Sequence, residues 1–151
     1  MECQNILFRW LDGRQGEDLR APAYQTEFAS GLDVQACING SLTLEPGDIS
    51  LVPTGFAVAV PPGYELQVRP RSGLAIKHGI TVVNAPGTID ADYRGEVKIG
   101  LVNLGRQAFT INRGDRIAQL ILAPVSKACL EVVEELPPTD RQAGGFGHTG
   151  R

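Results

Sequence analysis

The sequence predicts an all-β, single-domain fold: a β-barrel or jelly-roll-like arrangement of many short strands, with one short helix and a flexible C-terminal arm. Three observations lead to this prediction. Apolar and polar residues alternate over many short segments, and eighteen glycines and ten prolines punctuate the 151 residues. No window of ten or more residues repeats its apolar side chains with helical periodicity. Short strands joined by tight turns account for all three features.

The expected strands follow one another closely along the chain. Alternation typical of strands with one buried face occurs at 42–44, 56–60, 64–68, 97–101 and 109–111. Nearly continuous apolar runs predict strands buried on both faces at 49–52 and 117–123. Turns rich in proline, glycine, asparagine and aspartate separate these segments, as in Glu45-Pro46-Gly47-Asp48. The acidic stretch 131–140 is interpreted as a last strand followed by a linker.

The single expected helix is short, from about Ser72 to Lys77, with Ser72 available as its N-cap. A chain of this length suits one domain with a real hydrophobic core. We expect the folded body to span 1–135, and we expect 136–151 to form a linker and a glycine-rich arm.

The composition excludes several classes of partner. A formal net charge of −3 argues against a general nucleic-acid binder, so phosphate binding would need a local arginine cluster or a metal ion. We expect no membrane span, because no apolar run approaches the roughly 18–20 residues required. The N-terminus lacks the pattern of a secretory signal. Three widely spaced cysteines, an odd number, predict reduced thiols and a cytoplasmic location.

The last eleven residues, RQAGGFGHTGR, are the most informative segment. Glycine is costly to order, and the segment has too little apolar surface to form a core. Glycines that allow close backbone approach, one stacking ring at Phe146 and arginines at both ends suit an arm that closes over a nucleotide. The alternative is a frayed terminus without a function.

The segment 87–96, GTIDADYRGE, is the sharpest internal signal. A carboxylate at Asp90 can orient and deprotonate a water molecule, and the ring of Tyr93 can pack against a sugar. The alternative is a hairpin loop in which the aspartates only stabilise the turn, and we accept that interpretation for Asp92.

Four further residues, in three segments, are candidates. Arg71 and Ser72, in PRSG, open the expected helix, where backbone N–H groups attract anions; otherwise they form an ordinary capped helix. Asp33 is either a turn residue or an outer-shell partner of a magnesium ion held by phosphates. Gln119 interrupts an apolar strand, so its side chain needs a hydrogen-bonding partner in the backbone or in a ligand.

Five segments in register resemble the homotrimeric dUTPase family: ASGLDVQA, PRSGLA, NAPGTIDADYRGE, GDRIAQLIL and RQAGGFGHTGR. They run from residue 29 to the last residue. The resemblance implies hydrolysis of dUTP to dUMP and pyrophosphate with Mg²⁺. It also implies a homotrimer whose active sites are shared between subunits.

The resemblance also implies a role for each matching residue. Asp90 would be the general base that aligns water on the α-phosphorus, and Asp33 would contact metal-bound water. Tyr93 would lie beneath the deoxyribose and exclude a ribose 2′-hydroxyl. Substrate binding would involve the following further residues: Arg71, Ser72, Gly73, Asn84, Thr88, Ile89, Lys98, Gln119, Arg141, Phe146 and Gly147.

Two alternatives remain at this point. A dCTP deaminase, or a bifunctional relative, would share the fold and parts of two segments. That chemistry would favour a glutamate as acid–base and would not require the arm. A nucleotide-sensing protein would retain the site without turnover, although the proposed base, metal partner and arm all favour an enzyme.

Overall fold

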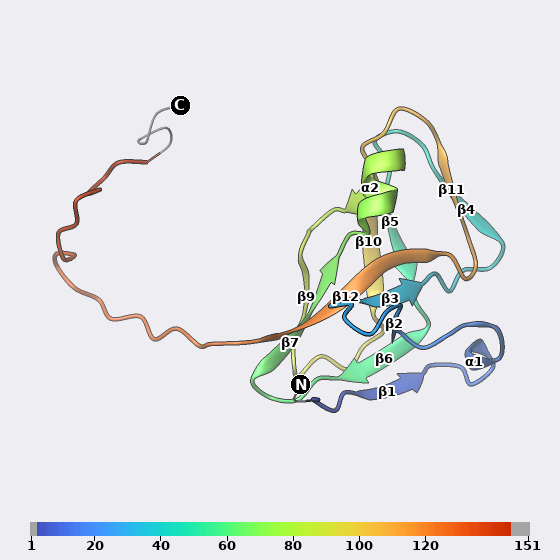
Figure 1. Ribbon diagram of the computed structural model, residues 1–151, viewed down its shortest axis with the longest axis horizontal. Coiled ribbons are helices and arrows are strands. Elements are labelled where there is room, and N and C mark those ends of the chain that lie inside the picture. Colours follow the sequence, from blue (N-terminus) through green and yellow to red (C-terminus); the bar gives the residue numbers. More distant parts are fainter. Residues whose placement is uncertain (1–2, 146–151) are drawn as a thin grey trace.

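A computed structural model describes residues 3–145, and these form twelve strands and two short helices (Figure 1). The all-β prediction is confirmed. In chain order the elements are β1 (Leu7–Trp10), α1 (Gln15–Asp18), β2 (Ala23–Tyr24), β3 (Leu32–Gln35), β4 (Ser41–Leu44), β5 (Ile49–Pro53), β6 (Phe56–Ala59), β7 (Tyr64–Arg69), α2 (Ser72–His78), β8 (Ile80–Val82), β9 (Gly87–Ile89), β10 (Lys98–Asn103), β11 (Phe109–Asn112) and β12 (Arg116–Pro124).

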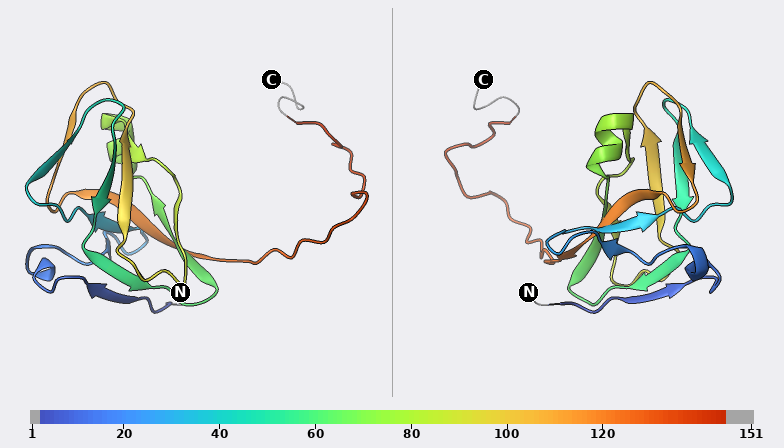
Figure 2. Two further views of the ribbon diagram at one scale, coloured as in Figure 1. Left: turned by 180° about the vertical axis from the view of Figure 1, so that it is seen from behind. Right: turned by 45° about the vertical axis from the view of Figure 1, so that its right-hand side comes forward.

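The strands form four antiparallel sheets, and strands distant in the sequence pair with one another. One sheet has the order β2-β3-β12-β7-β9 and another the order β5-β10-β8, while β1 pairs with β6 and β4 with β11. Figures 1 and 2 show β12 running across the direction of β10. Within the described residues the sheets stay open, so the arrangement is jelly-roll-like and not a closed barrel.

One hydrophobic core lies between these sheets. Each strand contributes alternate residues to it, as Leu66 and Val68 do in β7 and Ile99 and Leu101 do in β10. Burying aliphatic side chains of this size stabilises the fold by about 1.5–3 kcal/mol each. The alternation in the sequence therefore predicted the correct inward faces of these strands.

The run 49–52 is not buried on both faces. Val52 is fully buried, but Ile49 and Leu51 are 64% and 62% exposed. Side chains alternate along a strand, so Ile49 and Leu51 point to the opposite face of β5 from Val52, and only the Val52 face packs on the core. The continuous apolar run therefore includes an outer face, formed by Ile49 and Leu51, that the core of the chain does not cover.

The predicted strand within 131–140 is wrong. After β12 the chain leaves the body as an extended segment (Figures 1 and 2), and every residue of 126–143 is exposed. Val132 and Val133 carry the β propensity that suggested a strand. Three glutamates nearby and the lack of a neighbouring strand edge deny the segment a partner.

The predicted helix is present, although its cap differs. Arg71, and not Ser72, is the N-cap residue, with the extended dihedrals φ −91° and ψ 125° and no side-chain cap hydrogen bond. The chain is still extended at Arg71 after it leaves β7 through Pro70, so helical geometry begins one residue later. Ser72 is thus the first helical residue, and its hydroxyl is not used as a cap.

The short helix α1 was not predicted. Arg113, in the turn before β12, holds it through a bidentate contact: its Nε donates to Asp18 Oδ2 at 2.6 Å and its Nη2 to Asp18 Oδ1 at 2.9 Å. These hydrogen bonds hold the pKa of Asp18 below its ordinary value. The partners are 95 residues apart in the chain, so no local pattern could have indicated the pair.

No helix within residues 3–145 is both long enough and apolar enough to cross a membrane.

Gly79 and Gly40 offer a matched test of backbone strain, because both have φ +72°. A Cβ on Gly79 would run into the backbone of Gly105, whereas a Cβ on Gly40 would meet open space. Gly40→Ala should cost only left-handed strain, about 1–2 kcal/mol, and Gly79→Ala about 2–5 kcal/mol because overpacking adds to that strain. Urea unfolding would measure both, and equal losses would contradict the close approach of Gly79 to Gly105.

Candidate functional site

A cavity of about 610 Å³ opens between β9, β10 and the loop that joins them. Six of the predicted site residues line it: Asn84, Thr88, Ile89, Asp90, Tyr93 and Lys98. They do not form the hairpin loop considered above. β8 and β10 pair directly, and β9 leaves them to pair with β7 instead. The connection between two strands of one sheet thus supplies the edge of another sheet, and the cavity lies where the two sheets meet.

β9 presents its backbone as well as its side chains. It is the last strand of the five-stranded sheet, so only β7 pairs with it. In an edge strand, half of the N–H and C=O groups point away from the neighbouring strand. These groups provide fixed donors and acceptors beside the cavity, where a planar polar ligand could pair with them.

Two glycines pack closely against residues around the turn before β9. A Cβ on Gly87 would lie 3.3 Å from Asn84 Nδ2 and 3.1 Å from Val68 Cβ, and a Cβ on Gly100 would lie 3.0 Å from Val83 Cγ1. Sequence reasoning did not select Gly87 or Gly100. Glycine at these two positions leaves Val68, Val83 and Asn84 in place, whereas a Cβ would make them shift.

Asp90 follows β9 directly and is exposed. The turn after it is closed by the Tyr93 N–H, which donates to the Asp90 carbonyl at 3.2 Å. Arg94 Nη1 secures the same turn by donating to the carbonyls of Ala91 and Tyr93 at 2.7 and 2.8 Å. The ion pairs within residues 3–145 do not include Asp90. Its carboxylate is therefore available to accept a proton from water.

Tyr93 is held in one orientation although it is 45% exposed. Its ring lies against Gly95, where any Cβ would collide with it. Its hydroxyl donates to the carbonyl of Glu96 at 2.9 Å. Lys98, at the start of β10, pairs with Glu96 across 3.6 Å. The wall of the cavity thus combines a fixed ring with one carboxylate and one ammonium group.

A second group of predicted residues gathers around Asp33, on β3. The Asp33 carboxylate pairs with Arg116 Nη1 at 2.9 Å and with Arg71 Nε at 3.6 Å. Arg71 Nη1 also donates to the Arg116 carbonyl at 2.9 Å. Gln119 Nε2 donates to the Pro70 carbonyl at 3.0 Å, so the hydrogen-bonding partner expected for this side chain is a backbone group. We call Asp33, Arg71, Arg116 and Gln119 the arginine cluster.

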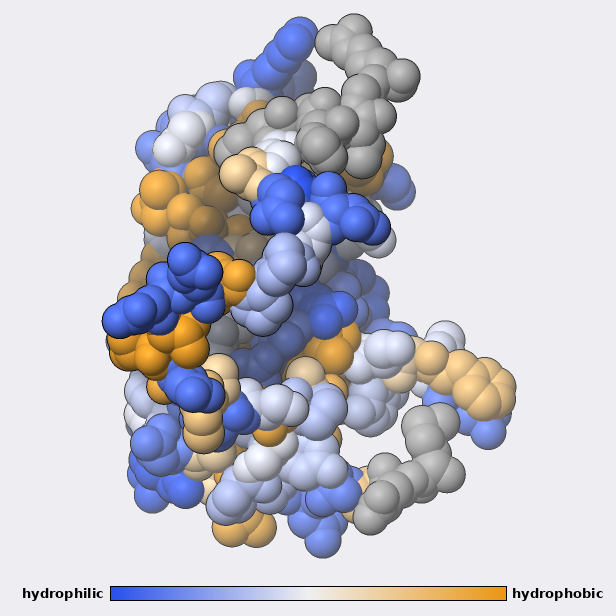
Figure 3. Space-filling model, turned by 90° about the vertical axis from the view of Figure 1, so that its left-hand side faces the viewer, coloured by the Kyte–Doolittle hydropathy of each residue, from blue (hydrophilic) through white to orange (hydrophobic). Residues whose placement is uncertain are grey.

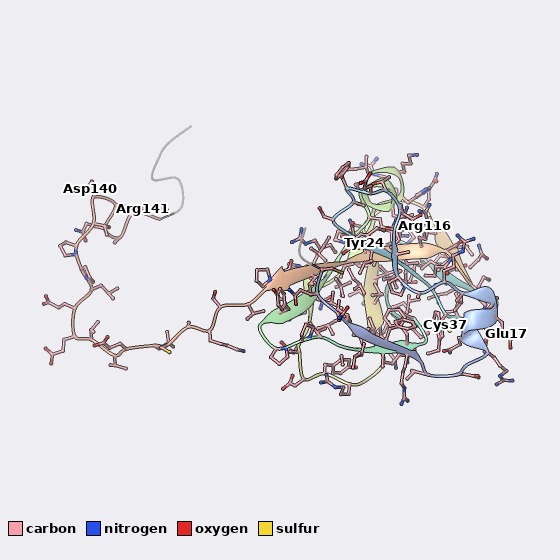
Figure 4. The ribbon with its side chains drawn as sticks, turned by 60° about the horizontal axis from the view of Figure 1, so that its bottom comes forward. Glu17, Tyr24, Cys37, Arg116, Asp140 and Arg141 are labelled. Carbon is pink, nitrogen blue, oxygen red and sulfur yellow. The ribbon has the colours of Figure 1, made fainter. Side chains whose placement is uncertain are left out.

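Three elements assemble the arginine cluster. Gln119 on β12 lies opposite Asp33 on β3 and opposite Arg69 at the end of β7. Gly31 allows this packing, since a Cβ there would collide with the Gln119 side chain. Ser72 and Gly73 lie exposed beside the cluster at the start of α2. A hollow of about 480 Å³ next to it is lined by Arg116 and Tyr24, both labelled in Figure 4.

Sequence reasoning missed Arg116 as a site residue. It belongs to the segment GDRIAQLIL, and its positive charge at the start of an apolar strand was the one feature that could have indicated a site residue. Its partner Asp33 lies 83 residues away, so the pair depends on the register of β3 with β12.

Asp90 and the arginine cluster lie at opposite ends of β7 within one chain. Ile89 pairs with Leu66, which places Asp90 level with Glu65, while Arg71 lies six residues further along. At about 3.3 Å per residue, the separation is on the order of 20 Å. One chain therefore does not bring Asp90 and Arg71 to the same phosphate group.

Arg141 lies on the extended segment that follows β12, far from Arg116 on the body (Figure 4). Its Nε donates to the carbonyl of Gly144 at 2.6 Å, a local contact. Phe146 and Gly147 lie outside the described residues.

The chain is similar in sequence to known proteins over most of its length. The dUTPase family profile matches residues 17–150. The chain is 69% identical over 147 residues to a deoxyuridine 5'-triphosphate nucleotidohydrolase of Desulfotalea psychrophila, covering 97% of this chain and 98% of that protein. It is 52% identical over 151 residues to the same-named protein of Roseobacter denitrificans, covering 99% of both.

Solved structures show the same fold. A variant dUTPase of Staphylococcus bacteriophage 80alpha with dUpNHpp matches with a TM-score of 0.81 and 25% identity, covering 97% of this chain and 99% of that one. A variant dUTPase of phage phi11 of S. aureus, described with a coordinated structural Mg(II) ion, matches with a TM-score of 0.75 and 26% identity. That match covers 87% of this chain and 97% of that one.

Proposed function

The chain belongs to the dUTPase family, and on this premise we propose that its site hydrolyses dUTP to dUMP and pyrophosphate. This reaction removes a source of uracil in DNA and supplies dUMP for thymidylate synthesis. The observation that carries the proposal is the cavity itself. An edge strand, an unpaired carboxylate and a fixed aromatic ring meet there within one short stretch of chain.

The uracil ring would bind along β9. The free backbone groups between Thr88 and Asp90, together with the carboxamide of Asn84, present donors and acceptors to the edge of a pyrimidine. Cytosine has a different donor and acceptor pattern and would leave polar groups unpaired in this site, which costs binding free energy. Lys98 and the backbone of Ile89 complete this wall.

The sugar and the reacting phosphate would lie next to Tyr93 and Asp90. The ring of Tyr93 would pack beneath the deoxyribose and leave no room for a ribose 2′-hydroxyl. Asp90 would act as the general base, holding one water molecule in line with the α-phosphorus and accepting its proton during the attack. The pyrophosphate then leaves with the electron pair of the broken phosphoanhydride bond.

The arginine cluster, with Ser72 and Gly73, would hold the triphosphate. Two guanidiniums suit phosphate oxygens because they donate paired hydrogen bonds. Gln119 would act here by fixing Pro70 and the turn that carries Arg71. In phosphoryl transfer, charge neutralisation and positioning of this kind supply most of the acceleration.

Magnesium fits this donor set as an ion carried by the substrate. Within residues 3–145, no group of three or more metal-ligating side chains is present, whereas Mg²⁺ bound to nucleotide phosphates keeps several waters and needs few protein ligands. Asp33 would accept hydrogen bonds from those waters. When bound, Mg²⁺ supplies positive charge that offsets the negative charge of the triphosphate.

We infer a homotrimer with shared sites, because Asp90 lies on the order of 20 Å from the arginine cluster of its own chain. A neighbouring subunit would supply Arg71, and the arm proposed at 136–151 would reach across from the folded body, whose last strand ends at Pro124. Exposed apolar side chains support an interface between copies: they include Ile49, Leu51 and Val83, and Figure 3 shows hydrophobic residues gathered along one edge of the viewed face. The free cysteines Cys3, Cys37 and Cys129 suit a cytoplasmic location.

A substrate panel tests the proposed function. Pyrophosphate release from dUTP should exceed release from dCTP, dTTP, dATP and dGTP by at least about 10²-fold, because the rejected bases leave polar groups in the site unpaired or do not fit it. Ammonia release from dCTP would instead indicate the deaminase alternative, which the comparisons do not favour. Tight dUTP binding without turnover would indicate a nucleotide sensor.

A further inference from the structure

The turn between β5 and β6 clamps the loop that carries Tyr93. Thr54 Oγ1 donates to the Val97 carbonyl at 2.5 Å, and the Gly55 N–H donates to Glu96 Oε1 at 3.0 Å. The Val97 N–H donates in turn to the Phe56 carbonyl at 2.9 Å. Three hydrogen bonds thus join two segments about forty residues apart. We call this set of contacts the turn clamp.

Glu96 connects the turn clamp to the cavity. Its side chain accepts from Gly55 and pairs with Lys98, while its main-chain carbonyl accepts the Tyr93 hydroxyl. The position of that carbonyl therefore fixes the outer end of the tyrosine ring. The position of the Glu96 carbonyl depends in turn on two neighbours: the Glu96 side chain, which Gly55 holds, and Val97, which Thr54 and Phe56 hold.

Thr54 is an unusual residue to find at this place. It is 1% exposed, and Thr54 and Asn103 are the buried polar residues of the described part of the chain. A buried hydroxyl is costly unless it is hydrogen-bonded, and the carbonyl of Val97 satisfies it. Valine has the same shape without that cost. The hydroxyl is therefore explained by what it holds, namely the residue that follows Glu96.

We propose that Glu96 and Thr54 are positioning residues for sugar selection: through the turn clamp they hold the Tyr93 ring where a ribose 2′-hydroxyl would collide with it. This inference rests on the proposed function, since it assigns the sugar to Tyr93. Loss of the turn clamp frees the Tyr93 ring to move outward, so the site can admit ribose. Uracil recognition by β9 and Asn84 stays unchanged.

Paired variants isolate each contact. Thr54→Val removes the hydroxyl and Thr54→Ser keeps it; Glu96→Ala removes both side-chain contacts, and Glu96→Gln keeps an acceptor for Gly55. Thr43→Val is the control, because Thr43 makes an exposed hydroxyl contact with Thr110 at 3.0 Å, on the pair β4-β11. The measured quantity is kcat/KM for dUTP divided by kcat/KM for UTP.

Thr54→Val and Glu96→Ala should lower this ratio at least about tenfold, the equivalent of one buried hydrogen bond, mainly through better use of UTP. Thr54→Ser, Glu96→Gln and the control should stay within about threefold of the wild type, because each keeps the clamp bonds or lies outside it. Tyr93→Phe should lower the ratio as well. Combining it with Glu96→Ala should add little, because Tyr93→Phe removes the hydroxyl's bond to the Glu96 carbonyl and Glu96→Ala loosens that carbonyl, so both changes release the same ring.

An unchanged ratio in folded Thr54→Val and Glu96→Ala would overturn the inference, as would an equal fall in the use of both substrates. Circular dichroism would establish folding, and Glu96→Ala, at a partly exposed position, serves if Thr54→Val does not fold. A wild-type protein without dUTP turnover would defeat the proposed function instead. The ratio of dUMP affinity to UMP affinity, measured by calorimetry in the same variants, would then still test the positioning role of Glu96 and Thr54. If the protein bound neither nucleotide, the proposed function and the positioning role would both be overturned.

Discussion

Replacing Asp90 with asparagine should reduce dUTP turnover by about 10²–10⁴-fold, the usual contribution of a general base. Asparagine has the same shape as aspartate, but it cannot accept a proton from the attacking water. Binding should persist, because the uracil edge is read by β9 and Asn84. Pyrophosphate release would measure the rate, and calorimetry with a non-hydrolysable dUTP analogue would measure affinity.

Asp92→Asn is the matched control for this result. Asp92 is an exposed carboxylate two residues further along the same loop, and it does not line the cavity between β9 and β10. Its replacement should leave turnover within about threefold of the wild type, as expected of a surface change that loses no more than a few tenths of a kcal/mol. Near-normal turnover in Asp90→Asn would exclude the general-base role. Equal losses in the two variants would indicate that the charge of the loop matters, and not one proton acceptor.

Removal of residues 141–151 should reduce turnover by about 10²-fold or more, the loss typical of removing groups that stabilise the transition state directly. The truncated chain lacks Arg141 for phosphate and Phe146 for stacking, and the site stays open to water. The thermal unfolding midpoint should not change, because 126–143 is exposed and the last strand ends at Pro124. Phe146→Ala should reproduce most of the loss.

Leu136→Ala controls for changes elsewhere in the segment, since that side chain is 84% exposed and precedes the removed residues. It should leave the rate unchanged. A lower unfolding midpoint after truncation would show that the arm is part of the body. Mixing Asp90→Asn chains with truncated chains should restore activity, because mixed trimers would combine an intact Asp90 with an intact arm. Absence of any recovery would contradict a site shared between subunits.

The sequence predicted much of the cavity because its residues lie close together in the chain. Asn84, Thr88, Asp90 and Tyr93 fall within ten residues, and a turn followed by an edge strand is a local structure. Arg116 was missed for the opposite reason. Its charge acquires a role only because the pairing of β3 with β12, which is irregular between Arg116 and Ala118, brings its guanidinium to Asp33.

Two predictions from local residue patterns were wrong, because each depended on contacts with distant parts of the chain. Val132 and Val133 favour a strand, but a strand exists only beside a partner, and none lies near 131–140 in the described chain. Ile49 and Leu51 suggested burial on both faces, yet the core of the chain reaches only one face of β5. The turn clamp of Thr54, Gly55, Glu96 and Val97 had no signature in the sequence at all.

By itself, the sequence determined the fold class, the inward faces of most strands and the residues that could carry the chemistry. Alternation and turn residues act over a few positions, so they can be read without a structure. Only the tertiary structure decided which sheet β9 joins, how Arg71 and Arg116 share Asp33, and that one chain holds Asp90 and its arginine cluster apart. Those outcomes depend on strand register and on packing between distant segments, which are set by the total free energy of the folded chain and not by any local pattern.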